Sequence, residues 1–167
     1  MITQEYVVTM ARYNAWQNTS LYIAAASLSD AERKRDRGAF FKSIHGTFNH
    51  LLWADQIWLS RFAGTLQPAG GIDRSSLLHD DFATQKSERA RIDRMILDWA
   101  VSVAPDWLAR DFSWYSASAK REMSYPTSTV MVHFFNHQTH HRGQLHAMLT
   151  QAGVVPEATD LFLMPAL

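Results

Sequence analysis

The sequence predicts an all-α protein, folded as a four-helix bundle with a small hairpin inserted before the last helix. Four long segments place apolar residues three and four positions apart, which is the spacing of a buried helical face. Glycine and proline separate these segments, and apolar and polar residues alternate in the stretch before the last one. With 167 residues, of which 47% are hydrophobic, the chain suits a single domain spanning residues 1–167.

The first half of the chain predicts two long helices joined by a short one. The first long helix is expected over residues 3–28. Residues 29–32, Ser-Asp-Ala-Glu, match a capping box, which predicts a short helix that ends near residue 37. The second long helix is expected over residues 43–62.

The next segments predict a long loop, a third helix and the hairpin. A stretch rich in glycine and proline begins at Gly64 and extends over some 15 residues. Loops of that length are often functional, and this one is a candidate to shape access to a site. A third helix is expected over residues 81–103 and ends before Pro105. Residues 111–125 alternate aromatic and polar side chains around a middle rich in serine and alanine, which predicts the hairpin.

The fourth long helix is expected over residues 128–151. Pro126 followed by Thr127 and Ser128 makes a good helix N-terminus, and Gly153 suits a left-handed C-terminal cap. The tail is expected to pack against the bundle through a short apolar run: Leu161, Phe162 and Leu163.

Composition excludes several classes of partner and site. The 16 basic residues balance 16 acidic ones without a basic run, so no nucleic-acid partner is expected. No apolar stretch approaches the roughly 20 residues that span a bilayer, and no signal peptide is recognisable, so we expect a soluble cytoplasmic protein with no membrane partner. The chain has no cysteine, so any metal must be held by nitrogen and oxygen.

Histidines gather in the last predicted helix, where residues 133–146 hold five of the eight in the chain. His137 and His141 are four residues apart, which places both imidazoles on one face of a helix as a divalent metal requires. His133 and His140 are expected to line a pocket or support the ligands, and His146 is expected to face solvent. A lone histidine on such a face is usually a core residue, but burying several imidazoles without partners is costly.

His50 in the second long helix is the predicted third ligand. Small residues one turn away on each side, Gly46 and Ala54, leave room for a neighbouring helix or a ligand. Asp55 lies about 140° around the helix from His50, so a salt bridge or an interface hydrogen bond is expected of it rather than ligation. Three histidines without a fourth protein ligand would leave an open coordination position, which is typical of catalytic metals.

The second helix also carries an apolar stripe on its opposite side: Phe41, Phe48, Leu52, Leu59 and Phe62. A helix that is apolar on two faces exposes a large patch unless something covers it. We therefore predict a homodimer through this outer face. The alternative is that the hairpin or the C-terminal tail covers the stripe.

Three motifs resemble the DinB/YfiT-like family of metal-dependent enzymes, the DinB family of damage-inducible proteins. They are Tyr-Asn-Ala-Trp at residues 13–16, Asn-His-Leu-Leu-Trp-Ala-Asp at residues 49–55, and the sequence from Asn136 to Gln144 that contains His-x-x-x-His-Arg-Gly-Gln. The resemblance implies a bundle of up-down-down-up type, often dimeric, with a divalent metal, commonly zinc or nickel. Carried over to this sequence, the ligands are His50, His137 and His141.

The resemblance also implies activity as a thiol-dependent transferase or isomerase that uses mycothiol, glutathione or bacillithiol. The first hypothesis is therefore a metal-dependent enzyme, a thiol-dependent S-transferase or a hydrolase, acting on a small electrophile. Because the chain lacks cysteine, a low-molecular-weight thiol would be the cosubstrate. Asn14 and Gln17 are the catalytic candidates that would orient the small-molecule substrate or a bound water, with a buried amide bonding between helices as the alternative for Asn14.

Two other hypotheses stay open at this point. One is a non-catalytic metal-binding or small-molecule-binding stress protein. The other is a bundle without a metal, whose histidines only form hydrogen bonds. A ferritin-like di-iron site is disfavoured because it needs inward-facing glutamates, which the two histidine helices lack.

Overall fold

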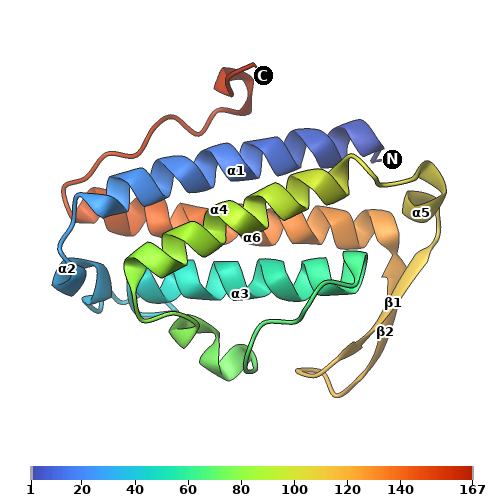
Figure 1. Ribbon diagram of the computed structural model, residues 1–167, viewed down its shortest axis with the longest axis horizontal. Helices are drawn as coiled ribbons and strands as arrows, with labels where there is room; N and C mark the ends of the chain where they lie inside the picture. The colour runs from blue at the N-terminus through green and yellow to red at the C-terminus, as the bar shows by residue number, and fades with distance from the viewer. Residues whose placement is uncertain (1, 167) are drawn as a thin grey trace.

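The computed structural model describes residues 2–166 and is mostly helical, with one small antiparallel sheet (Figure 1). The four long helices are α1 (Gln4–Ala26), α3 (Ile44–Ala63), α4 (Phe82–Ala100) and α6 (Thr127–Gln151). The short elements are α2 (Asp30–Lys34), the 3-10 helix η1 (Ile72–Leu77), α5 (Pro105–Ala109), β1 (Asp111–Ser116), β2 (Arg121–Pro126) and the 3-10 helix η2 (Leu161–Leu163). The prediction of a mostly helical protein with a hairpin before the last long helix is confirmed.

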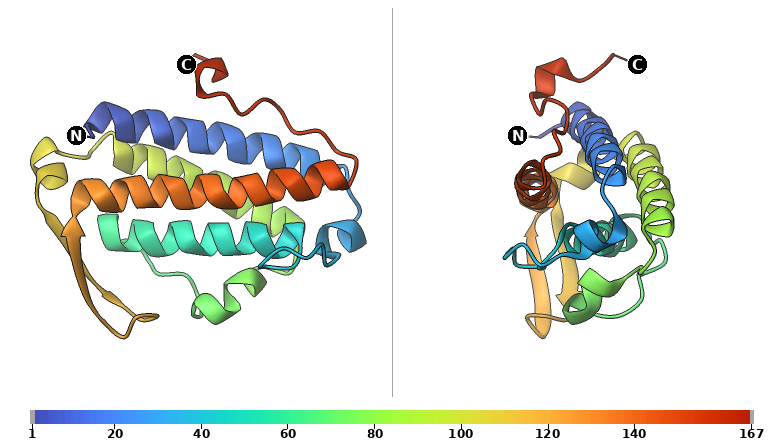
Figure 2. Two further views of the ribbon diagram at one scale, coloured as in Figure 1. Left: turned by 180° about the vertical axis from the view of Figure 1, so that it is seen from behind. Right: turned by 90° about the vertical axis from the view of Figure 1, so that its left-hand side faces the viewer.

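The four long helices lie side by side, and α1 and α6 run in the direction opposite to α3 and α4 (Figures 1 and 2). α1 packs against α4 and α6, and α3 packs against the same two helices. The hairpin lies at the end of the helices where α3 finishes and α6 begins (Figure 1). This arrangement brings the two histidine-bearing helices, α3 and α6, into direct contact.

Local sequence signals explain most helix ends. The hydroxyl groups of Ser29 and Ser43 accept hydrogen bonds from backbone N–H groups in the first turns of α2 and α3, and the carboxylate of Asp81 does the same for α4. The prediction for α6 is wrong in detail, because Pro126 occupies the cap position and no side chain caps the helix. Thr127 instead donates from its hydroxyl to the carbonyl of Arg110 at 2.7 Å, which ties α6 to the segment before β1.

The apolar stripe that predicted a homodimer lies inside the protomer. Phe48, Leu52 and Leu59 have 1%, 0% and 1% of their surface exposed, and they pack in the core between the long helices. Phe62 is partly buried against aromatic rings that include Phe112 of the hairpin, at 5.3 Å between centroids. The inference from this stripe to a dimer face is therefore wrong. Both apolar faces of α3 are covered by other parts of the same chain, so the homodimer stays a prediction without this support.

A chain of buried polar groups crosses the centre of the helix assembly. Asp55 on α3 pairs with Arg89 on α4 at 2.6 Å, and Arg89 also pairs with Asp93 at 2.8 Å. Gln138 on α6 donates to the second oxygen of Asp55, and Asn18 on α1 donates to Asp93. The salt bridge predicted for Asp55 is present, and this network links all four long helices.

The C-terminal tail is held by polar contacts rather than by its apolar run. Leu161, Phe162 and Leu163 are 42%, 84% and 53% exposed, so the expectation that they pack down is wrong. Tyr13 and Gln17 on α1 donate instead to backbone carbonyls of the tail, at Thr159 and Ala158. Among residues 2–166, no helix combines the length and the apolar character needed to cross a membrane.

Candidate metal centre

The side chains of His50, His137 and His141 meet between α3 and α6. Each contributes one ring nitrogen to a group whose atoms all lie within 4.8 Å of one another. Nε2 of His137 lies 3.4 Å from Nε2 of His50 and 3.1 Å from Nε2 of His141. The three residues predicted as ligands are thus brought together, two by the helical spacing and the third by packing of a separate helix.

Hydrogen bonds behind the rings determine which nitrogen carries the proton. The hydroxyl of Ser75 donates to the carbonyl of Ile72 at 2.7 Å, so its oxygen accepts from Nδ1 of His50 at 2.9 Å. The amide oxygen of Gln144 is only an acceptor, and it takes the proton of Nδ1 of His141 at 2.8 Å. In the neutral rings of His50 and His141, Nε2 is therefore unprotonated and carries a lone pair. Both lone pairs face Nε2 of His137.

Hydrogen bonding alone does not satisfy this arrangement. Nε2 of His137 can donate at most one hydrogen, whereas it faces two lone pairs, at 3.4 and 3.1 Å. At least one contact would then bring two lone pairs together. Two imidazole nitrogens bound to one tetrahedral cation at about 2.0–2.1 Å lie about 3.3–3.4 Å apart, close to the observed spacing. The donor set fits a divalent cation.

Burial keeps the three imidazoles neutral. Desolvation, with a smaller contribution from neighbouring histidines, lowers the pKa of His50 and the pKa of His137 to about 3 each. The pKa of His141 is also lowered, chiefly by burial, although its bond to Gln144 acts in the opposite direction. Neutral imidazole is the form that binds a metal, so the three nitrogens are available at neutral pH.

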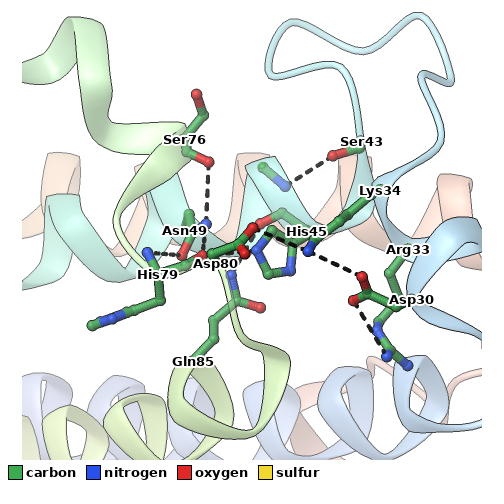
Figure 3. A network of polar contacts seen from close by, with 11 residues as sticks. Asp30, Arg33, Lys34, Ser43, His45, Asn49, Ser76, His79, Asp80 and Gln85 are labelled. Atoms are coloured by element: carbon green, nitrogen blue, oxygen red, sulfur yellow. Dashed lines mark hydrogen bonds and ion pairs between the residues drawn. The ribbon is translucent and has the colours of Figure 1, made fainter.

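A polar network around Asn49 fixes η1 and the residues after it against α3 (Figure 3). Ser75 of η1 lies behind His50, within hydrogen-bond distance of its ring. The buried amide of Asn49 donates to the carbonyls of Ser76 and His79, at 3.1 and 2.8 Å, and accepts from the backbone N–H of His79 at 3.1 Å. These bonds satisfy the loop's backbone groups, as buried backbone requires. The loop predicted from glycine and proline thus supports one residue of the histidine cluster, His50.

Aromatic rings border the histidine cluster. The ring of Phe41 stacks on that of His50 with 3.8 Å between centroids. On the other side the ring of His133 lies 6.0 Å from that of His137 and 5.5 Å from that of Trp58. His133 lines a cavity there, as predicted, and is not one of the converging ligands. Phe41, by contrast, was assigned to a dimer face and instead covers one face of the His50 ring.

The two catalytic candidates, Asn14 and Gln17, both lie on α1. Gln17 donates to the carbonyl of Ala158 at 2.9 Å and lines a cavity of about 400 Å³ beside the tail. The amide of Asn14 is buried and has no hydrogen-bond partner among residues 2–166. The three histidines are not among the residues that line that cavity in the described chain.

Arg142 and two other histidines of α6, His140 and His146, lie outside the cluster of three histidines. The guanidinium of Arg142 packs over the ring of Tyr13 at 5.4 Å, so the first-helix and last-helix motifs meet. Burial lowers the pKa of Arg142 to about 10. His140 is exposed with Nε2 3.3 Å from the amide nitrogen of Gln144, and His146 is half-buried, less open to solvent than expected.

Sequence reasoning missed the supporting role of two residues. Ser75 carries no spacing signal, because it lies in a loop 25 residues after His50 and meets it only through folding. Gln144 lies three residues after His141, and this helical spacing is the one signal that could have revealed their contact.

Comparison with known proteins identifies the family of the chain. The family model described as the DinB family matches residues 1–166. The chain is also similar to Protein DinB of Bacillus subtilis (strain 168), with 24% identity over 165 residues that cover 93% of this chain and 91% of the relative. The match takes in all three motifs and all three converging histidines, and the chain belongs to the DinB family.

Proposed function

We propose that this protein is a metal-dependent enzyme that holds a divalent cation on His50, His137 and His141 and acts on a small electrophile. The observation that carries the proposal is the convergence of three neutral imidazoles on one point, where hydrogen bonding leaves two lone pairs competing for one proton. A bound cation removes that conflict. Three protein ligands leave a further position open, as in catalytic sites.

At such a position a divalent cation supplies Lewis acidity, which lowers the pKa of a water or thiol that binds there. The chain itself supplies no thiol, since it has no cysteine, so a thiol-dependent S-transfer would use a low-molecular-weight thiol as cosubstrate. Hydrolysis would use water instead. Zinc and nickel are the proposed ions, because imidazole ligands suit both.

The protein's own residues would orient the ligands and exclude water. Ser75 and Gln144 hold two of the rings by their Nδ1 atoms, and Phe41 covers one face of His50. The antiparallel directions of the four long helices support assignment to a four-helix bundle of up-down-down-up type. In that bundle the site lies between the second and fourth long helices.

A non-catalytic metal-binding or small-molecule-binding protein is the second candidate function. One observation favours it: Gln17, one of the two residues predicted to orient a substrate, is instead bonded to the backbone of the tail. In this case the open position would bind a ligand without turnover.

Metal analysis tests the shared part of both proposals. Protein purified without a histidine tag is expected to carry about one zinc or nickel ion per chain, and His137→Ala to carry none. His146→Ala, on the same helix but outside the cluster, is the matched control and should retain the ion. Full metal content in His137→Ala would refute the ligand assignment. If wild-type protein is purified without metal and takes up no added ion, only the hypothesis of a metal-free bundle with hydrogen-bonded histidines remains.

Activity assays separate enzyme from binder. Metal-loaded protein is expected to transfer at least one of glutathione, bacillithiol and mycothiol to a small electrophile, or to hydrolyse an ester. Chelation should abolish turnover and re-addition of zinc or nickel should restore it. Stoichiometric metal without turnover on any of these substrates would favour the binder.

A further inference from the structure

The hairpin leaves a cavity of about 280 Å³ where it meets the end of α3 and the start of α6. Strand register pairs Trp114 with Met123 and Phe112 with Tyr125, so four apolar or aromatic side chains share one face of the hairpin. Phe112 packs into the core, whereas the other three line the cavity. Opposite them the wall is formed by residues of the two helices: Trp58, Val130 and His133.

The aromatic walls of this cavity are held in place. The indole rings of Trp58 and Trp114 meet edge to face with 5.3 Å between centroids. The guanidinium of Arg61 lies over Trp58 at 4.7 Å and reaches Trp114 at 5.9 Å. A cation is attracted to the face of an aromatic ring, so Arg61 stabilises this arrangement of the two indoles.

The size and lining of the cavity indicate the kind of group that fits. Ligand pockets usually measure about 300–1,000 Å³, so this one suits a single ring with its substituents. Aromatic rings pair best with another flat π system, stacked with an offset or edge to face. A small planar aromatic group meets both conditions, whereas a bulky aliphatic group meets neither.

One residue, His133, borders both this cavity and the histidine cluster. The ring of His133 forms part of its wall and lies 6.0 Å from the ring of His137. The two histidines are four residues apart, which is about 6 Å along a helix. A ligand that reaches past the ring of His133 would contact both the histidine cluster and the wall of this cavity.

We propose that this cavity binds the aromatic part of the small molecule that occupies the metal centre, so that the protein selects aromatic electrophiles over aliphatic ones. The proposal rests on the proposed function, which it deepens by naming the substrate class. Trp58, Trp114 and Met123 would be the residues that determine specificity.

The first experiment locates ring binding independently of the metal. Benzyl alcohol is titrated into the protein while the indole N–H signals of the six tryptophans are followed by NMR, with cyclohexylmethanol as the saturated counterpart. The signals of Trp58 and Trp114 should shift saturably, and benzyl alcohol should bind several-fold more tightly. Shifts confined to other tryptophans, or equal affinity for the two alcohols, would overturn the assignment.

The second experiment links the cavity to the metal centre. Acetohydroxamate, benzohydroxamate and phenylacetohydroxamate are bound to the zinc-loaded protein, since each has the same metal-binding head. At least one phenyl compound should bind about tenfold more tightly than acetohydroxamate, the size of a good aromatic contact. Trp114→Ala should remove that advantage and leave acetohydroxamate affinity unchanged.

Two further variants control for folding and for position. Met123→Ala removes a different wall of the same cavity and should reduce the phenyl advantage as well. Tyr115→Ala changes a residue that is 59% exposed on the opposite face of β1, and it should have no effect. A phenyl advantage that survives both cavity substitutions in folded protein would refute the proposal.

The outcomes also separate this inference from the proposed function. If the protein takes up no metal but benzyl alcohol still localises at Trp58 and Trp114, the proposed function fails and the ring-binding cavity stands. If metal and turnover are present without a phenyl advantage, only this inference fails.

Discussion

Ser75 and Gln144 each hold one imidazole by Nδ1, and in doing so they turn Nε2 toward the shared point. Supporting hydrogen bonds of this kind fix the tautomer and the orientation of a metal-binding ring. Without Ser75, Nδ1 of His50 would lose its partner, and the ring would be free to rotate or to change tautomer. The supporting serine is therefore as much a part of the candidate site as the histidine that it contacts.

Replacing Ser75 with alanine is expected to weaken zinc affinity by about 10–100-fold, the usual cost of losing such a partner. Competition with a chromophoric chelator measures the affinity. Ser76→Ala is the control, because Ser76 reaches α3 through its backbone carbonyl rather than its hydroxyl. Equal zinc affinity in Ser75→Ala and wild type would show that the contact does not orient His50.

Among the elements, α3 and α4 are joined by a buried ion pair. Arg89 is 3% exposed and lies between the carboxylates of Asp55 and Asp93. A buried charge costs several kcal/mol unless it is paired, so removing the central arginine leaves two carboxylates without their counter-ion.

Arg89→Met is expected to lower the free energy of unfolding by about 3–5 kcal/mol for that reason. Urea denaturation followed by circular dichroism measures the change. Arg94→Met, an exposed substitution on the same helix, should stay within about 0.5 kcal/mol of wild type. Similar stabilities of the two variants would mean that the pair adds nothing to the packing of α3 on α4.

Two helical glycines are expected to respond in opposite ways to substitution by alanine. A Cβ on Gly46 of α3 would overlap the backbone oxygen of Phe41, so the space beside His50 that the sequence left open is filled by the chain itself. A Cβ on Gly143 of α6 would meet nothing within 4 Å.

Gly46→Ala should therefore destabilise the protein by about 1–3 kcal/mol, as overpacking does, and should displace the Phe41 ring from His50. Gly143→Ala should stabilise it by about 0.5–1 kcal/mol, because alanine is the better helix former. Thermal unfolding of the two variants gives both values, and a stabilised Gly46→Ala would contradict the packing described for this turn.

For the molecule as a whole, the buried histidines make the stability of the metal-free protein depend on pH. Their pKa values are lower in the folded chain, about 3 for His50 and for His137, than the ordinary value of 6.5. Between these values the unfolded chain binds more protons, so stability falls as pH decreases from about 6.5 toward about 3. Asp93 acts the opposite way, because burial raises its pKa to about 6.

Comparison with a variant isolates the histidine contribution. Metal-free His137→Leu should lose less stability than metal-free wild type between pH 6.5 and 4, while the effect of Asp93 cancels in the difference. Asn136→Leu, an exposed and non-titrating change beside it, should keep the wild-type pH dependence. Parallel curves for wild type and His137→Leu in urea titrations would contradict the depressed pKa of this histidine.

The homodimer is also a property of the whole molecule, and it stays a prediction. The stripe that suggested it is buried within one chain, so a dimer would have to use another surface. Sedimentation at micromolar protein concentration tests it, and a monomer there would rule it out under those conditions.

The sequence by itself determined the helices and two of the three converging histidines. Periodicity and capping residues gave the second long helix as 43–62, against the observed Ile44–Ala63, because these signals act within a few residues of one another. Helical spacing alone placed His137 and His141 on one face, since four residues make about one turn. The motifs also identified the family, which the match over residues 1–166 confirms.

Only the tertiary structure decided what lies against α3. The sequence showed two apolar faces on this helix but not that both are covered within the chain, because periodicity reports burial and not the partner that provides it. For the same reason it did not reveal Phe41 over His50 or Ser75 behind it. Contacts between segments distant in sequence depend on how helices pack, and that packing brings the ring of His50 to the two histidines of α6.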